Sequence, residues 1–165
     1  MIRKIQENDI PRVAEIGVFG WRSAYRGILS DDYLFNNLTV AKNLDIWKDR
    51  IKNPAFETYV YDDGIVKAFM TIGKCGDKDK PESFEIGAIY VEPLMKRQGI
   101  GNKLVKFCEK RAKEHNYSEI VIWVFKDNAP SRKFYEAMGY SLEGAEKKEL
   151  RHGGALQVRY IKKLK

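Results

Sequence analysis

The order of apolar and polar residues in the first half of the chain predicts one strand, two helices and a hairpin. Residues 2–5 alternate as a short strand does, and a first helix follows them. Thr39 can cap a second helix, in which apolar residues recur at spacings of four, three and four. Residues 58–61 and 65–73 are rich in β-formers and flank Asp63-Gly64, a strong signal for a hairpin turn.

The middle of the chain predicts a strand and a helix separated by a glycine-containing turn. Residues 83–91 form the strand, which Pro93 ends. We expect one face of that strand to carry Glu85, Gly87, Ile89 and Val91. The helix begins at Gly99 or Gly101 and runs to about His115, with an apolar stripe along one side.

The last third of the chain completes a sheet. Residues 119–125 are apolar and β-branched, which is typical of a strand buried on both faces. Pro130 begins a short helix that Gly139 ends. Two more strands, 141–148 and 155–161, flank the turn His152-Gly153-Gly154. The whole pattern predicts one α+β domain over residues 1–165, with a mixed central sheet of about seven strands flanked by about four helices.

Composition excludes several classes of protein. No run of about 18 apolar residues occurs, so a membrane-spanning helix is excluded. The first ten residues contain no apolar signal segment. The two cysteines, Cys75 and Cys108, cannot build a disulfide framework, which favours a reducing, cytoplasmic location.

The positive charge is concentrated in two segments. The chain has 30 Lys and Arg against 23 Asp and Glu, a net charge of +7. Residues 96–113 hold seven basic residues and one Glu, and residues 146–165 hold seven basic residues and two Glu. Local positive charge suggests an anionic partner, such as a phosphate, a nucleic acid or a membrane surface.

The first basic segment opens with a candidate phosphate site, Lys96-Arg97-Gln98-Gly99-Ile100-Gly101-Asn102. Glycines let a backbone approach a ligand closely, and the helix behind them offers unpaired N–H groups. A tight strand-to-helix turn without a ligand is the alternative. Leu104 breaks the dinucleotide-binding glycine pattern, and the phosphate-loop pattern with Lys and Ser or Thr is absent.

A second group of residues lies between Asn128 and Tyr140. Asn128 follows the buried strand, where side chains emerge at the end of a sheet. Ser131 and Tyr135 are four residues apart and therefore share one face of the short helix. A packed aromatic with a solvated hydroxyl is the simpler interpretation of Tyr135.

Together the two groups resemble motifs A and B of the GNAT acyl-CoA N-acyltransferase superfamily. The first resembles Arg/Gln-x-x-Gly-x-Gly/Ala, with Lys96 at the Arg/Gln position, and the second is matched by Asn128, Ser131, Tyr135, Gly139 and Tyr140. The resemblance implies that acetyl-CoA is the co-substrate. It assigns these residues to acetyl-CoA binding: Ile89, Tyr90, Val91, Lys96, Arg97, Gln98, Gly99, Ile100, Gly101, Asn102, Asn128, Ser131 and Tyr135. It also divides the domain into the first strand and acceptor-site helices (1–57), an acetyl-CoA-binding core (58–142) and C-terminal strands (143–165).

The resemblance implies transfer of an acetyl group to a primary amine by direct attack. Glu85 is the candidate base, with an exposed strand position or an ion pair as the alternative. Tyr135 is the candidate acid for the leaving thiolate. Trp21 and Tyr25 are candidate acceptor-binding residues, because the family's first two helices flank the acceptor pocket; burial in the core is the alternative.

Partners and other functions follow from the same residues. A small molecule or a peptide is the expected amine acceptor, no membrane partner is expected, and no recognised nucleic-acid motif is present. His115 and His152 stand alone, so no metal site is expected. A non-catalytic acyl-CoA-binding protein and a basic nucleic-acid-binding module are the alternative functions. The sequence leaves open whether the chain forms a homodimer.

Overall fold

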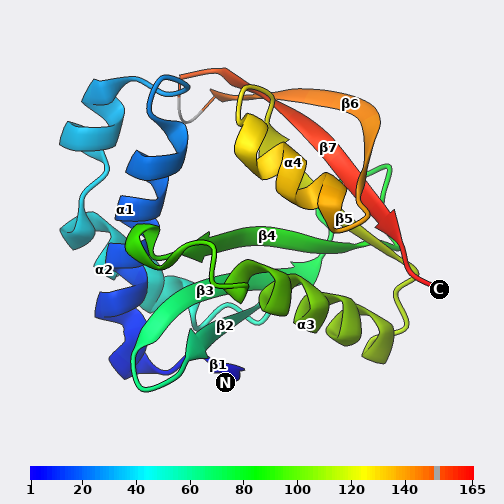
Figure 1. Ribbon diagram of the computed structural model, residues 1–165, viewed down its shortest axis with the longest axis horizontal. Coiled ribbons are helices and arrows are strands. Elements are labelled where there is room, and N and C mark those ends of the chain that lie inside the picture. Colours follow the sequence, from blue (N-terminus) through cyan, green and yellow to red (C-terminus); the bar gives the residue numbers. More distant parts are fainter. Residues whose placement is uncertain (151–152) are drawn as a thin grey trace.

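The computed structural model describes residues 1–150 and 153–165, and within them seven strands form one mixed sheet in the order β1-β2-β3-β4-β5-β7-β6 (Figure 1). The strands are β1 (Ile2–Lys4), β2 (Phe56–Asp62), β3 (Val66–Lys74), β4 (Phe84–Val91), β5 (Glu119–Phe125), β6 (Ser141–Glu149) and β7 (Ala155–Lys163). The helices are α1 (Ile10–Tyr25), α2 (Val40–Arg50), α3 (Ile100–Glu114) and α4 (Ala129–Ala137), with short helical turns η1 (Glu7–Asp9), η2 (Tyr33–Asn37) and η3 (Pro93–Met95). The predicted α+β class and seven-stranded mixed sheet are confirmed. His152 of the predicted last turn lies outside the described residues.

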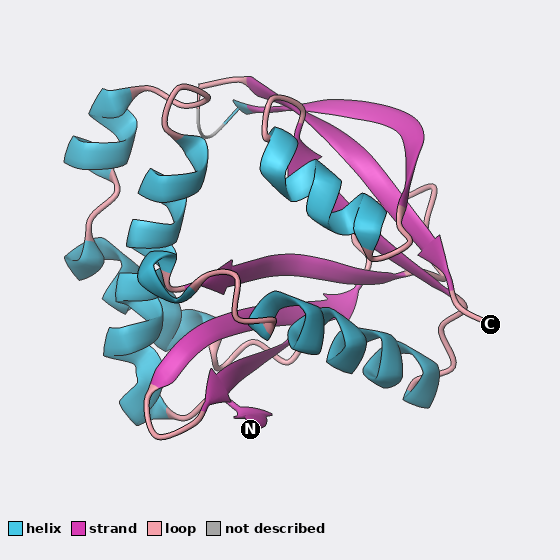
Figure 2. Cartoon of the chain, in the orientation of Figure 1, coloured by secondary structure: helices cyan, strands magenta, loops and turns pink. Residues whose placement is uncertain are grey.

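The helices cover the two faces of the sheet in pairs (Figure 2). Helices α1 and α2 pack on one face, where Trp47 and Phe69 belong to one apolar cluster. Helices α3 and α4 pack on the other, where Met70, Leu104 and Tyr135 belong to a second cluster. Phe69 and Met70 are neighbours on β3, so the alternation of a strand sends one side chain into each cluster.

Strands β4 and β5 are parallel and diverge toward α1 (Figure 1). They pair only at their beginnings, Phe84 with Ile120 and Glu85 with Val121. From Ile86 onward, the facing edges of the two described strands are therefore free of ladder pairs. An open edge inside a sheet leaves main-chain groups available to a ligand.

A bulge in β4 changes which of its residues share a face. Thr71 pairs with Ala88 but Ile72 pairs with Ile86, so Gly87 is the extra residue. Phe84 and Ile86 before the bulge, and Ile89 and Val91 after it, all contribute to the α3 side. The expectation that Glu85 shares a face with Ile89 and Val91 is therefore wrong, because the bulge shifts the alternation by one residue.

Local sequence signals place the ends of the helices near the cavity described below. Gly99 precedes α3 with φ +74°, a left-handed conformation that favours glycine. The side chain of Asn128 accepts a hydrogen bond from the N–H of Ser131 (3.3 Å) and caps α4. Gly139 follows α4 with φ +84°, as expected of a glycine that ends a helix.

Candidate active site

A cavity of about 590 Å³ lies where β4 and β5 diverge. Its wall is built by α1, β4, the segment before α3, the first turn of α3, β5 and α4. The cavity reaches both faces of the sheet, because Tyr25 comes from α1 on one face and Tyr135 from α4 on the other. A volume of this size suits a small molecule or the slender part of a larger one.

The beginning of α3 forms an anion cradle at one end of the cavity. The first helical hydrogen bond runs from the Lys103 N–H to the Gly99 carbonyl (3.1 Å), and no side chain caps the helix. The N–H groups of residues 100–102 therefore have no partner inside the helix, and the helix dipole adds partial positive charge there. A Cβ on Gly101 would lie 3.2 Å from the Phe134 ring, so a larger residue would crowd this wall. The cradle fits a pyrophosphate.

Lys96 and Arg97 add formal positive charge to this wall of the cavity. The Lys96 ammonium donates a hydrogen bond to the Ser23 hydroxyl on α1 (3.0 Å). Partial removal from solvent lowers the pKa of Lys96. Lys96 thus connects the segment before α3 to α1 beside the cavity.

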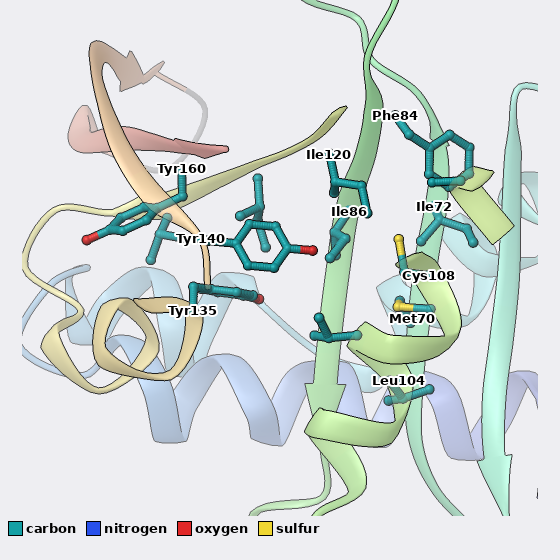
Figure 3. Packing of buried hydrophobic residues seen from close by; sticks show 14 of the residues in the cluster. Met70, Ile72, Phe84, Ile86, Leu104, Cys108, Ile120, Tyr135, Tyr140 and Tyr160 are labelled. Carbon is teal, nitrogen blue, oxygen red and sulfur yellow. The ribbon is translucent and has the colours of Figure 1, made fainter. Parts of the chain in front are cut away.

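Tyr135 lines the cavity from α4 and is 4% exposed. Burial raises the pKa of its phenol, so the hydroxyl stays protonated. Figure 3 shows Tyr135 beside Tyr140, and their ring centroids are 5.7 Å apart. The Tyr140 hydroxyl is buried and has no hydrogen-bond partner among the described residues. Tyr140 does not line the cavity.

A pair of tyrosine hydroxyls lies on the α1 side of the cavity. The hydroxyls of Tyr25 and Tyr90 are 2.8 Å apart, and both residues line the cavity. Burial raises the pKa of both phenols. Trp21 packs edge-on against Tyr25 with ring centroids 5.0 Å apart, behind the cavity wall. Gly20 permits this arrangement, because a Cβ there would lie 2.9 Å from a Tyr90 ring carbon.

Glu85 lies next to the point where β4 and β5 separate, beside the cavity wall. Its carboxylate accepts a hydrogen bond from the Gly76 N–H (3.3 Å). Burial raises the pKa of Glu85, Asp77 raises it further, and the nearby Lys147 ammonium opposes the shift. Because Glu85 pairs in register with Val121 on β5, it lies on the same face of the sheet as Trp123.

The structure brings most of the sequence-predicted site residues together. The predicted residues in the cavity wall are Tyr25, Ile89, Tyr90, Val91, Lys96, Arg97, Gly99, Ile100, Gly101, Asn102, Asn128, Ser131 and Tyr135. Glu85, Gln98 and Trp21 lie outside the wall. The residues that line it and that sequence reasoning missed include Gly20, Met95, Trp123 and Lys133. Among these, Trp123 carried a usable signal, as an aromatic with a polar N–H in a mostly aliphatic strand.

Two further properties concern the described residues as a whole. Among them, no group of three or more His, Cys, Asp or Glu residues could hold a metal ion. None of their helices is long and apolar enough to cross a membrane.

Comparisons with known proteins identify the family of the chain. The family model for the acetyltransferase (GNAT) family matches residues 21–140. The uncharacterized N-acetyltransferase YuaI of Bacillus subtilis is 31% identical over 136 residues, which cover 82% of this chain and 77% of YuaI. The spermidine N(1)-acetyltransferase of Thermoplasma acidophilum is 22% identical over 145 residues, which cover 88% of this chain and 90% of that protein. The PaiA N-acetyltransferase of the same organism, solved with coenzyme A, has a TM-score of 0.76 at 20% identity, covering 99% of this chain and 98% of its own. The chain therefore belongs to the acetyltransferase (GNAT) family of N-acetyltransferases.

Proposed function

We propose that this protein transfers the acetyl group of acetyl-CoA to a primary amine of a small molecule or a peptide, by direct attack of the amine. The observation that carries the proposal is the cavity at the divergence of β4 and β5, with an anion cradle at one end and Tyr135 in its wall. The cradle would hold the pyrophosphate of the co-substrate on the N–H groups of residues 100–102. The acyl end would then lie between the open edges of β4 and β5.

Glu85 is the proposed base for the acceptor. A free alkyl amine with a pKa of ~10.4 is only about one part in 2,500 neutral at pH 7, so removal of its proton must be assisted. A carboxylate at its ordinary pKa is a weak base, and burial raises the pKa of Glu85 toward neutrality. Its position beside the cavity suits proton transfer through an intervening water.

Tyr135 is the proposed acid for the departing thiolate. Its phenol stays protonated because burial raises its pKa, and the residue lines the cavity from α4. The hydroxyl is therefore available to donate to a sulfur atom in the cavity. Neither cysteine suits a covalent route: both thiols are buried, and burial raises the pKa of Cys75 to about 11.

The acceptor enters from the α1 face in this proposal. Tyr25 and Tyr90 form that wall, and aromatic faces with buried hydroxyls suit an alkyl ammonium group. The T. acidophilum relative is named for spermidine, which supports including polyamines among the acceptors tested.

Release of free thiol from acetyl-CoA tests the proposal across four acceptor classes: polyamines, aminoglycosides, amino acids and peptide N-termini. We expect one class to stimulate release well above the rate without acceptor, and the product to carry one acetyl group by mass spectrometry. Absence of stimulated release, together with tight coenzyme A binding, would instead favour a non-catalytic acyl-CoA-binding protein. Absence of both stimulated thiol release and coenzyme A binding would refute the proposed function.

A further inference from the structure

Lys147 on β6 differs from four cations packed around the C-terminal half of the sheet. Those cations are held by carboxylates: Lys80 by Glu119 and Glu143, Lys126 by Glu146, Arg159 by Asp77, Asp79 and Glu143, and Lys162 by Glu109. No described carboxylate lies within ion-pair distance of Lys147, whose side chain is exposed. Its amine is therefore free to move.

The contact that Lys147 does make is with a residue that lines the cavity. Its Nζ lies 4.0 Å from the centroid of the Trp123 ring, and Trp123 lines the cavity from β5. The Trp123 indole is itself fixed, because its N–H donates to Asp77 (2.9 Å) and Asp77 is bound by Arg159. A cation bound over an aromatic ring is a favourable arrangement that a flexible lysine can leave and regain.

Lys147 also faces the proposed base. Glu85 and Trp123 lie on the same face of the sheet, and the Lys147 ammonium is close enough to lower the pKa of Glu85 against the effect of burial. The other groups around that carboxylate are the Gly76 N–H, the Cys75 thiol and Asp77. Glu85 therefore has one flexible amine in its surroundings, and that amine belongs to this chain.

We propose that the ε-amine of Lys147 is an acetyl acceptor, so that the protein acetylates itself at this residue. The proposal rests on the proposed function. Glu85 takes one proton from the Lys147 ammonium, and the neutral Nζ attacks the acetyl carbonyl carbon of acetyl-CoA. An N–C bond forms, the C–S bond breaks, and Tyr135 supplies the proton for the coenzyme A thiolate. The nitrogen loses its second proton as the C–S bond breaks, and a proton returns to the Tyr135 phenolate. The products are one acetyl-lysine, one free thiol and one proton, which Glu85 releases to solvent.

Lys148 provides a matched control on the same strand. It is also exposed, but as the next residue of β6 its side chain points to the opposite face of the sheet, away from Trp123. Lys147→Arg keeps the positive charge and the ring contact but removes the acetylatable amine. Lys148→Arg makes the same chemical change where no transfer is expected.

The experiment incubates the purified full chain with acetyl-CoA and no added amine, then measures acetylation by intact mass and by peptide mapping. We expect Lys147 to acquire its acetyl group roughly tenfold or more faster than Lys148, because positioning raises its effective concentration. Lys147→Arg should lose this fast addition, Lys148→Arg should keep it, and Tyr135→Phe should slow it. The rate per chain should not depend on protein concentration.

Each contrary outcome refutes a defined part of the proposal. Equal labelling of Lys147 and Lys148, or labelling of Lys147 at an unchanged rate in Tyr135→Phe, would show uncatalysed chemistry and overturn it. Labelling that rises with protein concentration would place the acceptor in a second copy and overturn transfer within one chain. Thiol release with an added amine but no label on Lys147 would overturn this inference alone. Absence of both reactions would overturn the proposed function with it.

Discussion

The Tyr135 hydroxyl can be tested apart from the Tyr135 ring. Tyr135→Phe keeps the buried ring and removes only the hydroxyl, so we expect little change in Tm. Loss of a general acid should lower kcat by about 10²-fold or more. Steady-state kinetics of thiol release measure the change.

Tyr140→Phe is the control for Tyr135→Phe. Tyr140 packs against Tyr135 and has an unpartnered buried hydroxyl, but it lies outside the cavity wall. Removing that hydroxyl should leave kcat unchanged and stabilise the fold by about 1 kcal/mol, because an unsatisfied buried group is lost. Equal kcat values for Tyr135→Phe and the unmodified chain would remove Tyr135 from the acid role.

Glu85 should set the acid side of the pH–rate profile. The base works only when ionised, so activity should rise as pH increases through the pKa of Glu85 and be lost as pH falls below it. Burial raises that pKa, and therefore the loss should begin at a higher pH than for an ordinary carboxyl group. Glu85→Gln should lower kcat and abolish this limb. If Glu85→Gln showed the same loss of activity at acidic pH, the base would be another group.

Single residues were predictable from sequence where their role depends on a local motif. Gly99, Asn128 and Tyr135 each follow from spacing within a few positions, and each lines the cavity. The Tyr25–Tyr90 hydroxyl pair was not predictable, because it joins residues 65 positions apart. Lys147 is a similar case, since its contact with Trp123 depends on the order in which β5, β7 and β6 lie side by side in the sheet.

Helix α1 and strand β4 meet at a position where only glycine fits. Gly20→Ala would place a Cβ 2.9 Å from Cδ1 of Tyr90, so either the ring or the helix must move. We expect a loss of about 1–3 kcal/mol in the free energy of unfolding, typical of overpacking. Because the Tyr90 hydroxyl would move away from Tyr25, kcat/KM for the acceptor should also fall.

Gly17→Ala on the same helix separates packing from helix propensity. A Cβ at Gly17 would lie 3.8 Å from Phe69, which is an ordinary contact. Alanine is favoured over glycine in a helix interior by about 1 kcal/mol, so this variant should be neutral or more stable. Chemical denaturation of both variants measures the difference. Equal effects at the two positions would show that Gly20 is not a packing requirement.

At the level of elements, the periodicity of the sequence located the strands and helices but not the irregularities between them. The Gly87 bulge depends on the register between β3 and β4, and it reverses the face assignment of the residues that follow it. Ser30 indicates a short turn, and the Tyr33 N–H does donate to its hydroxyl, but the continuation of η2 to Asn37 follows no clear periodicity. The divergence of β4 and β5 leaves no trace in either strand's own sequence, and it creates the site.

Across the whole molecule, the distribution of charge makes a last prediction about the co-substrate. Seven basic residues and one Glu lie within residues 96–113, and this segment begins at the α3 cradle. Ligands with more phosphate groups should therefore bind more tightly and lose more affinity as salt is added. Coenzyme A at about 100 times its Kd should stabilise the fold by ~2.7 kcal/mol, a rise in Tm of roughly 5–10 °C.

Two ligands test the contribution of the phosphate groups separately: coenzyme A without its 3′-phosphate, and pantetheine, which has no phosphate. Pantetheine shares the arm that enters between β4 and β5 but has nothing for the N–H groups of residues 100–102 to bind. We expect the affinity to fall stepwise from coenzyme A to its dephospho form to pantetheine, by about tenfold or more at each step, as charge-assisted hydrogen bonds are lost. Differential scanning fluorimetry at two ionic strengths measures both the order and the salt dependence. If pantetheine stabilised the chain as much as coenzyme A at every salt concentration, the α3 cradle would not be an anion site, and the excess of basic residues there would need another partner.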